Sequence, residues 1–278
     1  MRSRPLPRAL PAVAAALLSA GLVACGGSSA AEPPAASGSA SPAADAGGTD
    51  ARVGLAAHAA LALDRHFTAL YTVDVPGETQ RSVMATSAAD GTWRVDIPGG
   101  ALGGTADVAI AEVEAGVFQC AIPSVTNPTL TSTCVKVAEK DERIPKKYDP
   151  RIERVFQQWL PVFTDRQSAL SVTTAQPLAG SSGTCYSIDS IAASLSAVVD
   201  VGIYCYADDG LLTAARVKFA TITIAGAPAA APATIDLPGP VSGGEPMGMA
   251  SPPPPPPPVE PSIDPSLPPA APSTAPSA

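Results

Sequence analysis

The strongest constraint on this chain is that both of its ends are low in complexity, so only its middle can form a packed domain. An unbroken proline run covers residues 252–258, and further prolines follow as far as Pro276. Residues 26–50 are mostly Gly, Ser, Ala and Pro. Such segments bury too little apolar surface to offset the entropy lost on ordering. We therefore predict a flexible linker over 26–50, a folded domain over 51–238 and a disordered Pro-rich tail over 239–278.

The first 25 residues are typical of a segment that directs export. Three arginines within the first eight residues give it a positive start, and the mainly apolar run over 9–24 is short for a membrane span. The run ends in Leu-Val-Ala-Cys at 22–25, which resembles a bacterial lipobox. In that motif the signal is cut before the cysteine, which then carries fatty acyl chains, and two chains hold a protein stably on a membrane. The resemblance implies a lipid anchor at Cys25 and a location on the extracytoplasmic face of the cell membrane.

The charge balance argues against a nucleic-acid partner. The chain has a formal net charge of -8, whereas binding to phosphate backbones requires a basic surface. One stretch over 143–154 is rich in Lys and Arg, interleaved with acidic residues. We interpret it as the solvated approach to a helix, with contact to anionic lipid headgroups as the alternative.

The apolar spacing of the domain predicts two helices and a large sheet. Helices are expected over 53–71 and 150–164, with Asp50 and Asp149 as N-caps. Asp-Gly pairs at 90–91 and 209–210 predict hairpin turns. The strands are expected over 79–87, 92–97, 105–113, 117–122, 132–138, 169–176, 183–188, 201–206, 211–219 and 220–224. This order predicts an α+β fold with the helices on one face of an antiparallel sheet.

Four cysteines remain in the domain, namely Cys120, Cys134, Cys185 and Cys205. An even number in an exported chain implies disulfides, and three pairings are possible. We favour Cys120–Cys134 and Cys185–Cys205, because each of these bonds joins strands that are neighbours in sequence. A zinc site is the weaker alternative, since zinc ligands come as closely spaced pairs together with histidines.

We find no constellation of residues that predicts catalysis, and we expect neither an enzyme nor a cofactor. The two histidines, His58 and His66, are eight residues apart and do not form the i, i+4 pair of a helical zinc site. The sequence Gly-Ser-Ser-Gly at 180–183 lacks the spacing of a nucleophile elbow. The glycines of 99–104 are not followed by the Lys-Ser or Lys-Thr of a phosphate-binding loop.

The best functional lead is the apolar stripe of the second predicted helix. Its residues at 152, 155, 156, 159, 160 and 163 share one helical face. They either pack as ordinary core against the sheet or line a cavity for an apolar ligand, together with the dry face of the strand at 92–97. The candidate cavity residues are Phe67, Trp93, Val95, Ile97, Trp159 and Phe163.

The layout of the domain resembles a family of bacterial lipoproteins. The features are the anchored signal, the segment Phe-Thr-Ala-Leu-Tyr at 67–71, the strand Trp-Arg-Val-Asp-Ile at 93–97 after an Asp-Gly turn, and Tyr-Cys-Tyr-Ala-Asp-Asp-Gly at 204–210 before the late strands. In these the chain is similar to the LolA-like (LppX/LprG-like) lipoproteins. The resemblance implies an unclosed antiparallel β-barrel packed on two or three helices.

The same resemblance implies a function. A LolA-like protein binds or carries an acylated lipid in an apolar cavity, so a lipid or lipoglycan is the expected ligand. The alternative is a non-catalytic cell-envelope interaction or sensor module, whose Pro-rich tail contacts a cell-wall polymer or a protein partner.

Overall fold

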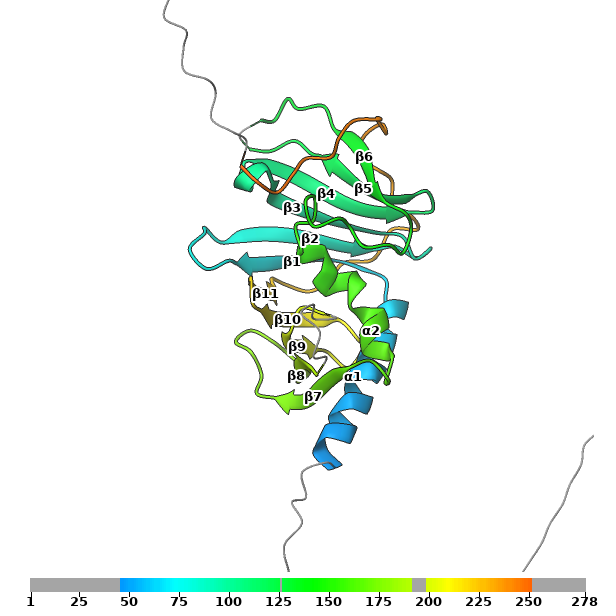
Figure 1. The fold of residues 1–278 in the computed structure, drawn as a ribbon, viewed down its shortest axis with the longest axis vertical. Coiled ribbons are helices and arrows are strands. Elements are labelled where there is room, and N and C mark those ends of the chain that lie inside the picture. The colour runs from blue at the N-terminus through cyan, green and yellow to red at the C-terminus, as the bar shows by residue number, and fades with distance from the viewer. Residues whose placement is uncertain (1–45, 126, 192–198, 252–278) are drawn as a thin grey trace, which may run out of the picture. The chain divides into compact units, whose positions relative to one another are not determined.

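The computed structural model describes residues 46–125, 127–191 and 199–251. In this part of the chain eleven strands form one antiparallel sheet, in the order β6-β5-β4-β3-β2-β1-β11-β10-β9-β8-β7 (Figure 1). The edge strands β6 and β7 do not pair with each other, so the sheet is not closed. The predicted α+β class and the unclosed antiparallel sheet are therefore confirmed. The signal, the lipobox and most of the linker lie outside the described residues.

The elements of the first half of the domain are α1 (Ala46–Asp64), β1 (Phe67–Asp74), β2 (Arg81–Ser87), β3 (Trp93–Ala101), the short 3₁₀ turn η1 (Leu102–Gly104), β4 (Ala106–Val113), β5 (Gly116–Ala121) and β6 (Thr133–Ala138). Those of the second half are the π-helical turn η2 (Arg154–Gln158), α2 (Leu160–Thr164), β7 (Leu170–Ala175), β8 (Thr184–Ser190), β9 (Gly202–Tyr206), β10 (Leu212–Val217) and β11 (Thr221–Ile224).

The main core lies between the helices and one face of this sheet, which we call the inner face. Leu55 and Ala59 of α1 are fully buried there, as are Val155 and Phe163 of the second helical segment. They pack against the inward-pointing side chains of the strands. Alternate residues of an antiparallel strand point to opposite faces, so each strand contributes every second side chain to this core.

The predicted helix over 53–71 is wrong at both ends. Helix α1 begins at Ala46, so Asp50 lies inside it rather than capping it, and the helix ends at Asp64. The residues that follow form β1, in which Phe67 and Tyr71 point into the core while Leu70 is exposed. The alternation of buried and exposed residues has period two, and aromatic and β-branched residues favour strands. The helical spacing of 63, 67 and 70 is a coincidence across the helix–strand junction.

The second predicted helix is confirmed in position but is not a regular α-helix. Its helical residues run over 152–164 and include the π-helical turn η2. The backbone N–H of Trp159 donates to the carbonyl of Arg154, one residue beyond the α-helical partner. Pro161 has no N–H to donate, and an irregular turn before a proline accommodates that loss. Asp149 accepts a hydrogen bond from the Arg151 N–H at 2.7 Å, but Arg151 has a φ of +69° and the helical residues begin only at Ile152. Asp149 therefore stabilises the turn before the helix, and its predicted role as N-cap is wrong.

The chain after β11 covers the outer face of the sheet. Ala229 pairs with Thr68 beside β1, and the Ile235 N–H donates to the Thr92 hydroxyl at the β2–β3 turn. Leu237 then packs on Phe118 and its neighbours on the outer face of β4 and β5. In Figure 1 this orange segment passes beside β5 and β6.

The domain also continues beyond residue 238, where we predicted a disordered tail. Val241 forms a parallel bridge with Cys134 on the edge strand β6. Farther on, the side chain of Gln119 accepts from the Met247 N–H at 2.6 Å and donates to its carbonyl at 3.0 Å. Residues 239–251 therefore pass around the β6 edge from the outer to the inner face and belong to the domain. The proline run and the rest of the predicted tail lie outside the described residues.

Candidate functional site

Five of the six candidate cavity residues are part of the packed core. Val95, Ile97 and Phe163 are fully buried, and Phe67 and Trp159 are nearly so. The Phe163 ring meets the Tyr204 ring edge-on, with 5.1 Å between the centroids. None of these five side chains is among the residues that line the pocket described next. Trp93 is the exception, because it is only partly buried and lines a pocket.

This pocket lies between the second helical segment and the β2–β5 part of the sheet, and we call it the helix–sheet pocket. Its volume is about 470 Å³, within the range of small-molecule sites. Its apolar lining comes from α1, two strands, the 139–151 loop and α2, through Leu63, Trp93, Val117, Ile144 and Pro161. Its polar lining consists of Ser87, Glu112, Asp141, Glu142, Glu153, Gln157 and Gln158, with the backbone of Gly91 completing the wall.

Two of these acidic residues are held in place by the fold. The Glu112 carboxylate accepts from the Trp93 indole N–H at 3.2 Å and from the Asp141 backbone N–H at 3.0 Å. Asp141 has a φ of +62°, a strained conformation for a residue with a side chain. The 139–151 loop is thereby fixed against β3 and β4, and the loop brings Asp141 and Ile144 to the pocket.

Glu153 is the functional residue that the sequence reasoning missed. Its residue surface is 3% exposed, and its Oε2 atom is buried without a hydrogen-bond partner among the described residues. Burial raises the pKa of this carboxyl from 4.5 to about 8, a shift that the nearby Asp200 increases. On a helical wheel Glu153 lies beside the apolar stripe, so its position predicts a solvated side chain. No local pattern identifies it, because a helical residue directly after the buried Ile152 is rotated away from the apolar face.

The basic groups near Glu153 are engaged with other partners. Arg154 forms an ion pair with the buried Asp149 and lies 3.8 Å from the Asp200 carboxylate. Asp200 also accepts from the Trp159 indole N–H at 3.2 Å. The guanidinium groups of Arg143 and Arg154 lie 5.2 and 5.8 Å from the centre of the Trp159 ring. This cluster orients Trp159 and leaves the pocket itself acidic.

Both predicted disulfides are present. Cys120 and Cys134 face each other across β5 and β6, and Cys185 and Cys205 face each other across β8 and β9. All four lie on the outer face of the sheet, away from the main core. Two separate small clusters on the outer face are therefore covalently pinned.

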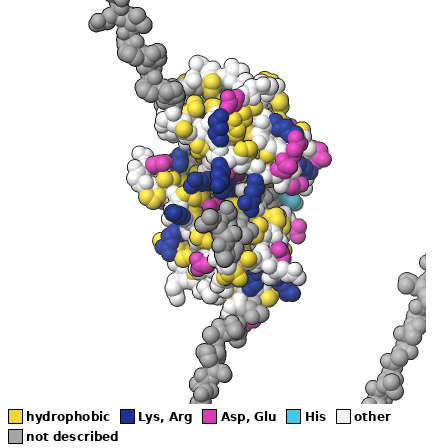
Figure 2. All heavy atoms as spheres, viewed as in Figure 1, with side chains coloured by type: hydrophobic (Ala, Val, Ile, Leu, Met, Phe, Trp, Pro, Cys, Tyr) yellow, Lys and Arg dark blue, Asp and Glu magenta, His cyan; other side chains and the backbone are white. Residues whose placement is uncertain are grey.

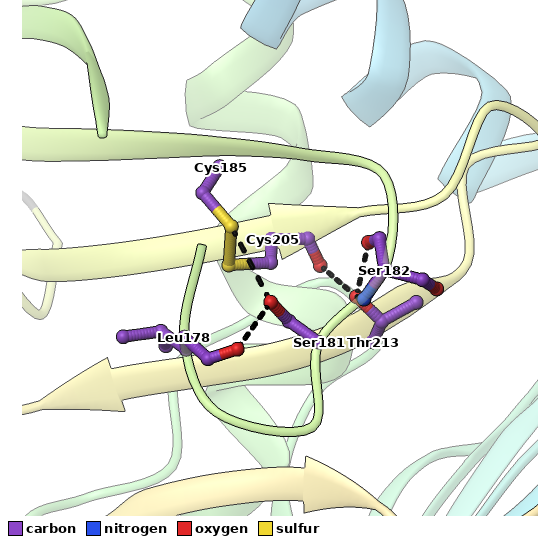
Figure 3. The surroundings of a disulfide bond; sticks show 6 residues. All are labelled: Leu178, Ser181, Ser182, Cys185, Cys205 and Thr213. Carbon is purple, nitrogen blue, oxygen red and sulfur yellow. Dashed lines mark hydrogen bonds between the residues drawn. A yellow bond between two sulfur atoms is a disulfide. The ribbon is translucent and has the colours of Figure 1, made fainter. Parts of the chain in front are cut away.

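A loop covers the second disulfide (Figure 3). The Ser181 hydroxyl donates to the Leu178 carbonyl at 2.7 Å and lies 3.7 Å from the Cys185 sulfur. The buried Thr213 hydroxyl donates to the Ser182 carbonyl at 2.7 Å and accepts from its N–H at 3.2 Å. These bonds tie the loop to β10, so the Gly-Ser-Ser-Gly sequence at 180–183 has a structural role.

His58 makes contacts between α1 and β8. His58 Nδ1 is 2.9 Å from the Tyr186 hydroxyl and 3.0 Å from the Gly54 carbonyl, at the contact between α1 and β8. Within the described residues, no group of three His, Cys, Asp or Glu side chains is arranged to hold a metal ion.

A second, shallower hollow lies between the first turns of α1 and strand β7. Its volume is about 630 Å³, and Arg52 and Arg166 are among the residues that line it. The Arg52 guanidinium donates to the Asp165 carbonyl at 2.6 Å, so part of this hollow is occupied by a structural contact. It is therefore a weaker candidate for a ligand site than the helix–sheet pocket.

The basic side chains of the stretch over 143–154 are exposed, apart from the partly buried Arg154. Figure 2 shows Lys and Arg side chains gathered across the middle of the viewed face. Lys147 pairs with Glu245 at 2.5 Å, which links the stretch to the C-terminal segment. The stretch thus serves in part as an attachment point for residues 239–251.

In the part of the chain that the structure describes, no helix has both the length and the hydropathy of a membrane-spanning segment. Among known proteins, no family model matches the chain and no curated protein matches it.

Proposed function

We propose that the protein is a membrane-anchored envelope lipoprotein that binds an acylated lipid in the helix–sheet pocket. The observation that carries the proposal is the pocket itself, which has about 470 Å³ of space and apolar side chains on both its helical and its sheet wall. Burial of apolar surface contributes about 25 cal/mol per Å², or about 0.8 kcal/mol per methylene. A chain of a few carbons would thus gain useful affinity without any covalent chemistry.

The remaining parts of the proposal rest on the sequence. Acyl chains such as palmitate on Cys25 would hold the protein on the extracytoplasmic face of the membrane, and the linker would let the domain reach lipids there. The unclosed sheet with helices on its inner face is compatible with a LolA-like fold, which we propose as the architecture. The basic stretch over 143–154 would suit an anionic membrane surface.

A variant that fills the pocket tests this proposal. Val117 is buried on β5 and lines the pocket, so Val117→Phe should place a ring in the space that the ligand would use. The matched control is Val125→Phe, because Val125 is fully exposed. Native mass spectrometry of the purified protein should show bound acyl lipid in the parent and the control but not in Val117→Phe. A parent that carries no lipid and takes up none on incubation with long-chain amines, alcohols or fatty acids would contradict the proposal.

The alternative is a non-catalytic interaction or sensor module of the cell envelope. The observation that favours it is the dense packing around Phe163 and Trp159, where the sequence had allowed a cavity. In this reading the helix–sheet pocket is incidental and the Pro-rich tail provides the binding function. A lipid-free protein in the experiment above would favour this alternative.

A further inference from the structure

The helix–sheet pocket has a strongly one-sided charge. Four carboxyl side chains line it, those of Glu112, Asp141, Glu142 and Glu153, and its described lining contains no Lys, Arg or His. Glu112 has protein partners, whereas Oε2 of Glu153 has none among the described residues. It is the one carboxyl oxygen in the described part of the chain that is buried without a hydrogen-bond partner.

An unpaired buried carboxyl is costly, because its desolvation is not repaid by a hydrogen bond. A ligand group that donates hydrogen bonds to Glu153 would remove this cost. One side of the pocket therefore presents a carboxyl group without a partner, and the other side presents apolar side chains. A ligand that fits both sides carries a hydrogen-bond donor at one end and an apolar part at the other.

We propose that the ligand of the helix–sheet pocket carries a cationic amine at its polar end, and that the carboxyl group of Glu153, which lines the pocket, turns its buried, unpartnered Oε2 toward the ammonium group. The inference rests on the proposed function and adds the charge of the ligand to it. The apolar part of the ligand would lie against Leu63, Val117 and Ile144, which line the same space.

Other polar ends fit this pocket less well. A carboxylate or phosphate would enter a site lined by Glu112, Asp141 and Glu142 and meet repulsion that a partly buried setting screens only weakly. A hydroxyl group could donate one hydrogen bond to Glu153 but would leave the charge of the pocket unbalanced. An ammonium group donates up to three hydrogen bonds, and charge-assisted bonds are about twice as strong as neutral ones. The Trp93 ring in the same wall adds a surface that attracts cations.

Binding of a cation should be coupled to a proton. The raised pKa of Glu153 means that its carboxyl is mostly protonated at pH 7 when the pocket is empty. An ammonium group favours the ionised form, so binding would release the carboxyl proton to solvent. The surrounding charges agree with this direction. Burial and Asp200 on the neighbouring segment disfavour ionisation. Glu112, Asp141 and Glu142 line the same pocket, while Arg154 is engaged by Asp149 and Asp200 and Arg143 lies over Trp159.

Calorimetric titration with three chains of equal length tests the inference. Octylamine, octanol and octanoate differ only in the polar end, and the protein is the full-length chain carrying Cys25→Ser, which cannot be acylated. We expect octylamine to bind about tenfold more tightly than octanol, octanoate to bind most weakly, and close to one proton to be released per octylamine at pH 7. The proton count comes from titrations in buffers of different ionisation enthalpy.

Glu153→Gln should abolish both the amine preference and the proton release. The control is Glu114→Gln, which removes the same charge from an exposed residue between β4 and β5 that does not line the pocket. A measurement on the parent alone keeps the inference testable even if Glu153→Gln disturbs folding. Below pH 8 the octylamine affinity of the parent should rise about tenfold per pH unit and level off above it.

The outcomes separate the two proposals. Octanoate or octanol binding as tightly as octylamine, or an amine preference that survives in Glu153→Gln, would overturn the inference and leave the lipid-binding function standing. If none of the three chains binds, both the inference and the proposed function are wrong.

Discussion

At the end of the sheet formed by β7–β11 aromatic side chains close the inner face, whereas at the β2–β5 end the second helical segment leaves a pocket of about 470 Å³. The rings of Phe163 and Tyr204 meet at 5.1 Å between centroids, and Phe156 meets Tyr71 at 4.7 Å in the middle of the sheet. The hydroxyls of both tyrosines donate to backbone carbonyls. Toward β2–β5 the same segment presents Glu153, and no described residue bonds to its Oε2.

The difference between the two ends shows that the second helical segment has two roles. One side of it belongs to the core, and the other side lines the helix–sheet pocket. Its apolar stripe points to the tyrosines and supplies packing, while Glu153, Gln157 and Gln158 face the pocket and cannot fill it with apolar atoms. A closed core at one end gives the rigidity that a half-polar pocket at the other end requires. The two ends should therefore respond to mutation in opposite ways, one through stability and the other through binding and pH.

The largest effect should come from the closed end. Phe163→Ala removes a fully buried ring that packs on Tyr204. We expect a loss of about 3–5 kcal/mol in the free energy of unfolding, because the transfer term and the remaining cavity add. Denaturant unfolding measures it. A loss below about 1 kcal/mol would mean that this end is not tightly packed and would remove the contrast between the two ends.

The stability that a disulfide contributes can be compared directly between the two ends, because each end contains one disulfide. Their sequence separations are 14 and 20 residues. Replacing either pair by alanine should cost about 3 kcal/mol, with the two variants within a few tenths of each other by chain entropy. Thermal unfolding of Cys120→Ala/Cys134→Ala beside Cys185→Ala/Cys205→Ala checks this. A much larger cost for one pair would show that its covering segment depends on the bond.

The pH dependence should come from the pocket end. The pKa of Glu153 is about 8 in the folded protein against 4.5 for an unperturbed side chain, so the folded state binds more protons between these values. Stability from this group is present below pH 4.5 and is lost as the pH rises toward 8. We expect about 2 kcal/mol less stability at pH 7 than at pH 5.5 from Glu153 alone. Glu153→Gln should flatten that slope, and an unchanged slope would contradict the assignment.

The smallest effect concerns the segment that passes around the β6 edge. A chain ending at Pro238 lacks Met247, which satisfies both polar groups of the buried Gln119 amide. Compared with a chain ending at Ser251, it should be less stable by about 1 kcal/mol, because the Gln119 side-chain oxygen loses the Met247 N–H while the amide nitrogen keeps the Tyr148 carbonyl at 3.4 Å. Hydrogen exchange of β5 and β6 should rise in the shorter chain. Equal stability would place the domain boundary at 238 after all.

Local patterns in the sequence predict the sheet and its bonds. Asp-Gly turns and alternating strands predict β2–β5 and β8–β11, and the two disulfides join cysteines on adjacent strands as expected. These features depend on neighbours in sequence, where turn chemistry and side-chain alternation decide the structure. The extension of the first predicted helix into β1 is a local error that comes from apolar residues that fit both periods near Phe67.

The pocket depends on contacts that no local pattern contains. Glu153 becomes buried because the 139–151 loop crosses to β3 and β4, fixed by the bond from the Asp141 N–H to Glu112. Residues 239–251 are held by Gln119, more than a hundred residues away in sequence. Five of the expected cavity residues are core for the same reason, since only the three-dimensional arrangement decides which apolar side chains meet one another and which border a space.

The two tryptophans give the most direct test of the central claim, that the ligand binds at the β2–β5 end. Trp93 lines the helix–sheet pocket and Trp159 is buried in the packed segment, and the chain has no other tryptophan. A Trp159→Phe chain therefore reports on the pocket, and a Trp93→Phe chain reports on the core. Titration with octylamine should change the emission of Trp93 saturably and leave that of Trp159 constant. A response from Trp159 alone, or from neither residue, would contradict binding in this pocket.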